Sequence, residues 1–145
     1  MRKFLVASVL ASLASLASLA AGAGCARTDR GAAAEQAPAR VETVSVDQLD
    51  QMLASHDCTA VDANGEATRK KLGVIPGAVL LTDMDSLDKL PADKTTSLVF
   101  YCANTSCGAS HDAAVKAMTA GYTRVKVLPD GIAGWVRAGK TTSSI

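Results

Sequence analysis

The sequence predicts an α/β domain with a central, mostly parallel sheet and helices on both of its faces. Short apolar segments rich in β-branched residues alternate along the chain with segments of helical periodicity, which is the pattern of such a sheet. The 145 residues suffice for one domain with a core of its own but not for two comfortable ones. A formal net charge of +1 gives no indication of a nucleic-acid partner or of a polybasic membrane surface.

The first 24 residues have the composition of an export signal. Arg2 and Lys3 precede an apolar run that ends in small residues at 22–24. The run is short and contains Ser and Gly, which favours cleavage over a transmembrane anchor. Cys25 follows directly and is a lipidation candidate, because the segment resembles a lipoprotein signal that lacks the usual large aliphatic residue. Two outcomes stay open for this exported, periplasmic protein: a membrane tether through Cys25, or ordinary secretion.

The chain after the signal divides into three parts. Residues 25–40 are small and polar without apolar periodicity and predict a flexible linker. The folded domain is expected over 41–140, and 141–145 form a tail. Within the domain, we expect helices over 46–55, 66–72, 109–120 and 131–139, and strands over 59–63, 77–81, 97–102 and 124–128.

Cys102 ends the most clearly predicted strand, "SLVFYC". Ligands of open parallel sheets bind at the carboxyl ends of the strands, so this position is a candidate site. A loop that leads into a helix directs backbone N–H groups and the positive end of the helix toward the cysteine, and these stabilise a thiolate. An inert core cysteine is the alternative, but the polar loop favours a reactive one. The candidate loop comprises Ala103, Asn104, Thr105, Ser106, Cys107, Gly108, Ala109 and Ser110.

Four segments in order carry a resemblance to the single-domain rhodanese-like (sulfurtransferase) family, in an exported bacterial form. They are "AVDAN" (60–64), "GVIPGAVLL" (73–81), "LVFYC" (98–102) and "GYTRVKVLPDGIAGW" (121–135), and the likeness covers nearly all of 41–140. The resemblance implies that Cys102 takes sulfane sulfur from a small donor as a persulfide and passes it to a thiol or cyanide acceptor. This chemistry requires no metal, nucleotide or other cofactor, because the nucleophile and the product are already charged.

The sequence also departs from this family at several positions. The loop after Cys102 contains no Lys or Arg, Asn64 stands where some members have arginine, and Val74 replaces the motif histidine. A missing arginine weakens the expected recognition of thiosulfate, and it argues harder against a cysteine phosphatase or an arsenate reductase. A cation for the pocket would have to come from Arg69, Lys70 or Arg137.

Three further residues accompany Cys102 as candidates. Cys107 either acts as a resolving thiol that forms a disulfide with Cys102, or fills the loop with its thiol turned away. His111 is expected near the pocket, with a solvated surface histidine as the default. Asp62 either orients the loop or caps a turn. Zinc binding is disfavoured, because Cys102, Cys107 and His111 lack the tight spacing of a zinc knuckle and would need a convergent fourth ligand from His56 or Cys58.

Three classes of function follow from these observations. The first is a sulfurtransferase that uses Cys102, and the second is a thiol redox protein that uses Cys102 and Cys107 together. The third is a non-catalytic rhodanese-like module that binds an anion or a protein, since this fold also occurs without catalysis.

Overall fold

The computed structural model describes residues 40–83 and 87–145, so the predicted signal, most of the linker and Cys25 lie outside the described residues. The elements are β1 (Glu42–Thr43), α1 (Val46–Ala54), β2 (Thr59–Asp62), α2 (Glu66–Leu72), β3 (Val79–Leu80), β4 (Leu98–Tyr101), α3 (Ala109–Thr119), β5 (Val125–Leu128) and α4 (Gly131–Arg137). The five strands form one sheet in the order β1-β5-β4-β2-β3, and each of these neighbouring pairs is parallel. The predicted α/β class is confirmed.

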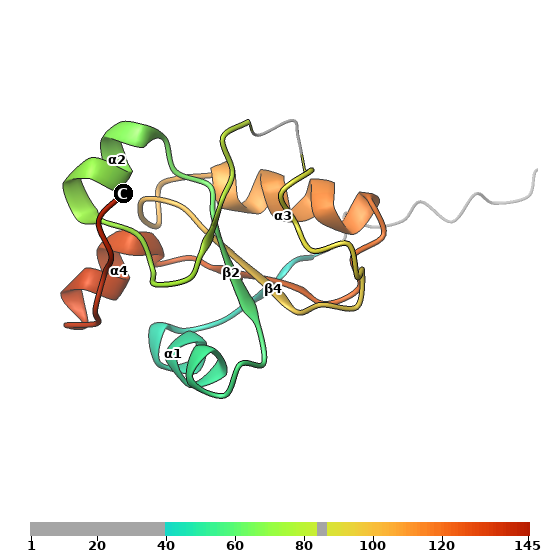
Figure 1. Ribbon diagram of the computed structural model, residues 1–145, viewed down its shortest axis with the longest axis horizontal. Helices are drawn as coiled ribbons and strands as arrows, with labels where there is room; N and C mark the ends of the chain where they lie inside the picture. Colours follow the sequence, from blue (N-terminus) through green and yellow to red (C-terminus); the bar gives the residue numbers. More distant parts are fainter. Residues whose placement is uncertain (1–39, 84–86) are drawn as a thin grey trace, which may run out of the picture. The chain divides into compact units, whose positions relative to one another are not determined.

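The central strand β4 shows how the sheet divides the core into two layers. Leu98 and Phe100 face the layer that contains the alanines of α3, whereas Val99 and Tyr101 face the layer that contains residues of α1 and α4. All four side chains are fully buried, because a central strand is covered on both faces. Figure 1 shows α3 on one side of β2 and β4 and α1 on the other.

Strand β4 ends one residue earlier than the sequence predicts, so Cys102 follows the strand instead of ending it. The reason is a change of hydrogen-bond partner. The Cys102 carbonyl accepts a hydrogen bond from the backbone of α4, not from a neighbouring strand. Strand β3 is also shorter than the predicted 77–81. The two-residue edge strand β1 was not predicted, because two residues are too few to show a period.

Two residues of the 141–145 tail form hydrogen bonds with the domain. Val74 and Ser143 exchange two backbone hydrogen bonds of 2.9 Å each. The indole nitrogen of the buried Trp135 donates to the Thr141 carbonyl at 2.8 Å. Within 40–83 and 87–145, no helix is long and apolar enough to cross a membrane.

Candidate functional site

The backbone at Cys102 is held by the start of α4. The N–H groups of Ile132 and Ala133 donate to the carbonyls of Cys102 and Ala103 at 2.8 and 3.0 Å. This close approach requires glycine at position 131, where φ is +58° and a Cβ atom would lie only 2.5 Å from the Cys102 oxygen. The beginning of the loop is therefore fixed by a contact between segments about thirty residues apart in the sequence.

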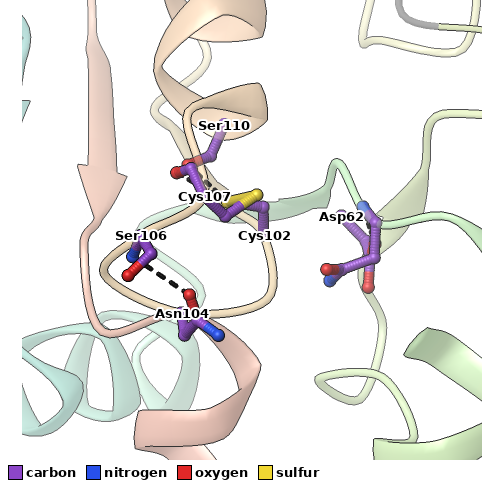
Figure 2. Close-up of a disulfide and its surroundings, with 7 residues drawn as sticks. Asp62, Cys102, Asn104, Ser106, Cys107 and Ser110 are labelled. Carbon is purple, nitrogen blue, oxygen red and sulfur yellow. Dashed lines mark hydrogen bonds between the residues drawn. A yellow bond between two sulfur atoms is a disulfide. The ribbon is translucent and has the colours of Figure 1, made fainter.

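Cys102 and Cys107 are joined as a disulfide, with their Cα atoms 6.3 Å apart (Figure 2). The Cys102 residue is 1% exposed, whereas Cys107 is partly exposed and packs against the core. Of the two roles that the sequence left open for Cys107, the structure thus shows the one in which its sulfur meets that of Cys102.

Asn104 makes the turn that brings Cys107 back to Cys102. Its side-chain oxygen accepts a hydrogen bond from the Ser106 N–H at 3.0 Å, drawn as a dashed line in Figure 2. Its backbone carbonyl accepts another from the Cys107 N–H at 3.0 Å. Such asparagine turns are stable local structures, and this one closes the loop between the two cysteines.

Ser110 is the side chain in the first turn of α3 that contacts the Cys102 sulfur. Its Oγ lies 3.2 Å from Cys102 Sγ, and the residue is 3% exposed. The N-cap of α3 is Gly108, which has no side chain to satisfy the first N–H groups of the helix. A thiolate at Cys102 would therefore meet a hydroxyl donor and the positive end of an eleven-residue helix.

A second oxygen, the carbonyl of Cys107, lies 3.1 Å from Cys102 Sγ. A reduced Cys102 can donate its S–H hydrogen to this carbonyl, which favours the neutral thiol. Among the hydrogen bonds of the described residues, none runs from a backbone N–H to Cys102 Sγ. The ring of backbone donors that the sequence suggests therefore stays a prediction for the reduced loop.

Asp62 lies at the end of β2 and belongs to a separate polar cluster (Figure 2). It is fully buried, and its Oδ1 accepts hydrogen bonds from the Asn64 N–H at 2.7 Å and from Arg69 Nε at 3.1 Å. Arg69 also donates to the carbonyls of Asp62 and Leu81 at 3.1 and 2.7 Å. These contacts fit the turn-capping role proposed for Asp62 and none of them reaches the loop after Cys102.

The three cations that might have supplied the pocket have other positions. Arg69 is 6% exposed and is committed to Asp62. Lys70 forms an exposed ion pair with Glu66 at 2.5 Å. Arg137 is exposed in the last turn of α4, whereas the first turn of that helix is the one that contacts Cys102.

Among the hydrogen bonds and ion pairs of the described residues, none joins His111 or Cys58 to Cys102 or Cys107. His111 is exposed in the first turn of α3. Cys58 is half-buried, and burial followed by the charge of Asp57 raises the pKa of its thiol to about 11, which keeps it protonated at neutral pH. Within the described ranges, no group of three His, Cys, Asp or Glu side chains is close enough to hold a metal ion.

Sequence reasoning missed two supports of the loop, and each has a different reason. Gly131 lies in a segment that carries the family resemblance, but the sequence assigns it no role, because its contact with Cys102 is long-range. The sequence places Ser110 in the candidate loop without a role, and only the helical geometry of α3 directs its hydroxyl to the sulfur.

The chain matches one family model and is similar to several solved structures. The family model described as "Rhodanese-like domain" matches residues 45–138. A Rhodopseudomonas palustris protein of unknown function, described as a possible tyrosine phosphatase, is 25% identical with a TM-score of 0.59, over 71% of this chain and 85% of its own. The rhodanese-like domain of an Anabaena protein is 22% identical with a TM-score of 0.60, over 73% of this chain and 81% of its own.

A third structure is a thiosulfate sulfurtransferase from Pseudomonas aeruginosa. It is 24% identical with a TM-score of 0.59, over 74% of this chain but only 20% of its own. At these identities, the Anabaena and Pseudomonas structures show a shared fold. No curated protein matches the chain at a significant level.

Proposed function

The chain belongs to the rhodanese-like domain family, and from this premise we propose that it is a sulfurtransferase that carries sulfane sulfur as a persulfide on Cys102. The observation that carries the proposal is the position of the Cys102 sulfur. It lies just past the carboxyl end of a central strand, 3.2 Å from the Ser110 hydroxyl and beside the start of α3. The hydroxyl and the helix start favour an anionic sulfur, against the effect of the Cys107 carbonyl, and the anion is the form that attacks a donor and carries the transferred sulfur.

The proposed reaction has two transfers at sulfur. First, the Cys102 thiolate attacks the outer sulfur of a small persulfide donor, forming one S–S bond while the donor leaves as a thiolate. The product is Cys102–S–SH, which ionises to the persulfide anion. A thiol or cyanide acceptor then attacks the outer sulfur, and Cys102 leaves as a thiolate. Neither step requires a general base or a cofactor.

The cations of the described residues suggest which donor is used. Thiosulfate is a dianion and is best held by a charged partner such as arginine. Arg69 is instead bound to Asp62, and the loop from Cys102 to Ser110 contains no cation. We therefore propose an organic persulfide as a better donor than thiosulfate.

The protein is further proposed to act after export, either free in the periplasm or tethered through Cys25. This proposal rests on the sequence of residues 1–24 alone. Cell fractionation of the wild-type chain and of Cys25→Ser tests it, since only a lipidated protein would move from the membrane fraction to the soluble fraction on this substitution.

Sulfur loading of the reduced full-length chain tests the proposed activity. After treatment with glutathione persulfide, intact-mass spectrometry of Cys107→Ser should show a gain of one sulfur atom that is lost on adding cyanide. Cys102→Ser should gain none, while Cys58→Ser serves as a matched control because its half-buried thiol lies outside the loop. Loading that is equal in Cys102→Ser and Cys107→Ser, or absent from both, would reject the proposal and favour a non-catalytic module.

The Cys102–Cys107 disulfide favours a second candidate, a dithiol protein that oxidises or reduces other thiols. This function needs both cysteines and no sulfane sulfur. It predicts that oxidised wild-type protein transfers its disulfide to a small dithiol, while sulfur loading of Cys107→Ser is absent.

A further inference from the structure

We propose that Cys107 discharges the Cys102 persulfide, so that this domain releases sulfane sulfur as sulfide and finishes as the Cys102–Cys107 disulfide. The inference rests on the proposed function, because it requires the persulfide on Cys102. It adds a second outcome for the bound sulfur, namely reduction to sulfide in place of transfer to an acceptor.

The disulfide identifies the atom that Cys107 can reach. Its sulfur is bonded to Cys102 Sγ, and in the persulfide Cys102 Sγ is the inner of the two sulfurs. External acceptors attack the outer sulfur, which is the transfer reaction. Attack on the inner sulfur instead expels the outer one. The position of Cys107 therefore selects the reaction that releases sulfide.

The step balances without any other reactant. The Cys107 thiolate and Cys102–S–SH become the Cys102–S–S–Cys107 disulfide and HS⁻. One S–S bond forms and one breaks, the proton leaves on the sulfide, the outer sulfur is reduced, and the two cysteines are oxidised together. A small dithiol in solution then reduces the disulfide, which returns both thiols for the next cycle.

Burial favours Cys107 over external thiols for this attack. Cys102 is 1% exposed in the disulfide form, so a donor or an external thiol reaches its sulfur only when the reduced loop opens, whereas Cys107 needs no such access. Cys107 is already part of that loop and is partly exposed, so the regenerating dithiol can attack it first. Cys102 is then the leaving thiolate, beside the Ser110 hydroxyl at 3.2 Å.

Two sets of contacts hold the loop backbone on either side of the reacting sulfurs, so that the two cysteines stay close to each other. The start of α4 fixes the backbone on the Cys102 side through the 2.8 Å bond from the Ile132 N–H. The Asn104 turn fixes the Cys107 side through its bonds to the N–H groups of Ser106 and Cys107. Asn104 is thus a positioning residue, and preorganisation of this kind accelerates a reaction by several orders of magnitude.

A single-turnover measurement tests the inference on the full chain carrying Cys25→Ser and Cys58→Ser, which leaves only the two loop thiols. The reduced protein is mixed with one equivalent of glutathione persulfide and no other thiol. Sulfide is trapped with a fluorescent bimane reagent, and intact mass is recorded in parallel. Cys102→Ser in the same background measures sulfide from decay of the donor.

The parent protein should release one equivalent of sulfide, and its mass should fall by that of two hydrogen atoms because the disulfide forms. Adding Cys107→Ser should keep the sulfur adduct and slow sulfide release at least about 100-fold, because the intramolecular advantage is lost. Asn104→Ala should slow sulfide release about tenfold with loading unchanged, and Asn104→Asp, which keeps an acceptor for the Ser106 N–H, should restore most of the rate.

The other outcomes separate the two proposals. If the parent and Cys107→Ser both hold the adduct and release no sulfide, or release it at the same rate, the role of Cys107 is wrong while the sulfurtransferase proposal stands. If Cys107→Ser gains no sulfur at all, the sulfurtransferase proposal is wrong and the role of Cys107 is rejected with it.

Discussion

Replacing Gly131 by alanine is expected to damage both the stability of the domain and the loading of sulfur on Cys102. The added Cβ would lie 2.5 Å from the Cys102 carbonyl oxygen and 2.7 Å from the carbonyl carbon of Ala103, both backbone atoms that cannot rotate away. The start of α4 must therefore withdraw from the loop. The residue would also have to keep a left-handed φ of +58°, which disfavours any side chain.

The magnitude follows from these contacts. A left-handed conformation costs a residue with a side chain about 1–2 kcal/mol, and overpacking adds about 1–3 kcal/mol. Withdrawal of α4 further weakens the hydrogen bonds from the Ile132 and Ala133 N–H groups, each worth about 1 kcal/mol. We expect the free energy of unfolding to fall by about 3–5 kcal/mol. The total is less than the sum of the separate costs, because withdrawal of α4 weakens the hydrogen bonds but relieves part of the clash.

Gly139→Ala is the matched control for backbone conformation. Gly139 has φ of +73°, but its Cβ would meet nothing within 4 Å. The free energy of unfolding of Gly139→Ala should therefore fall only by the cost of the left-handed backbone conformation, about 1–2 kcal/mol. Urea denaturation of the reduced proteins measures both free energies of unfolding. Glutathione persulfide loading is compared without denaturant, at a temperature where far-UV circular dichroism shows that both variants are folded.

The difference between the two variants carries the test. Gly131→Ala should be less stable than Gly139→Ala by about 2 kcal/mol and should load sulfur more slowly, while Gly139→Ala loads at the wild-type rate. Equal free energies of unfolding, within about 0.5 kcal/mol, together with equal loading would refute the claim that α4 supports the loop.

Three further substitutions and titrations probe the neighbouring residues. Ser110→Ala in a Cys107→Ser background should move the pH profile of Cys102 alkylation to higher pH, because the thiolate loses its hydrogen bond from the hydroxyl, and an unchanged profile would contradict this. Arg69→Met leaves a buried carboxylate unpaired and should lower the free energy of unfolding by about 3–5 kcal/mol in urea, whereas a loss below 1 kcal/mol would show that the pair is dispensable. Cys58 should be alkylated slowly until the pH approaches its folded pKa of about 11, and rapid alkylation at pH 9 would contradict the burial of this thiol. Because the folded pKa is raised from 9.0, the contribution of Cys58 to stability is complete below pH 9 and declines above it.

The position of Cys102 was predictable because it depends on local pattern. A run of apolar and β-branched residues marks a buried strand, and a parallel sheet places its functional residues where such strands end. The sequence placed Cys102 on the last strand residue, and the structure places it one residue beyond. That shift depends on the carbonyl partner supplied by Ile132, which no local pattern contains.

The Cys102–Cys107 pairing was not predictable for a geometric reason. Five residues of separation allow the two sulfurs to meet or to point apart, and the turn made by Asn104 decides between them. An asparagine in a polar loop predicts a turn but not its direction. Spacing therefore left both roles of Cys107 open.

Arg69 illustrates a limit of charge patterns. Arg69, Lys70 and Lys71 are consecutive, and the sequence offers no means of telling which cation is buried. The structure shows that Arg69 faces the sheet edge, where the Asp62 carboxylate and the Leu81 carbonyl bind it. Its commitment there removes Arg69 from the groups available to hold a substrate anion.

The most direct test of the central claim is to locate the transferred sulfur on the chain. The reduced Cys107→Ser protein is loaded with glutathione persulfide, blocked with iodoacetamide, digested, and its cysteine peptides are sequenced by mass spectrometry. We expect one additional sulfur on the peptide that contains Cys102 and none on the peptide that contains Cys58. Sulfur distributed equally over the two peptides, or absent from the Cys102 peptide, would contradict the claim that Cys102 carries it.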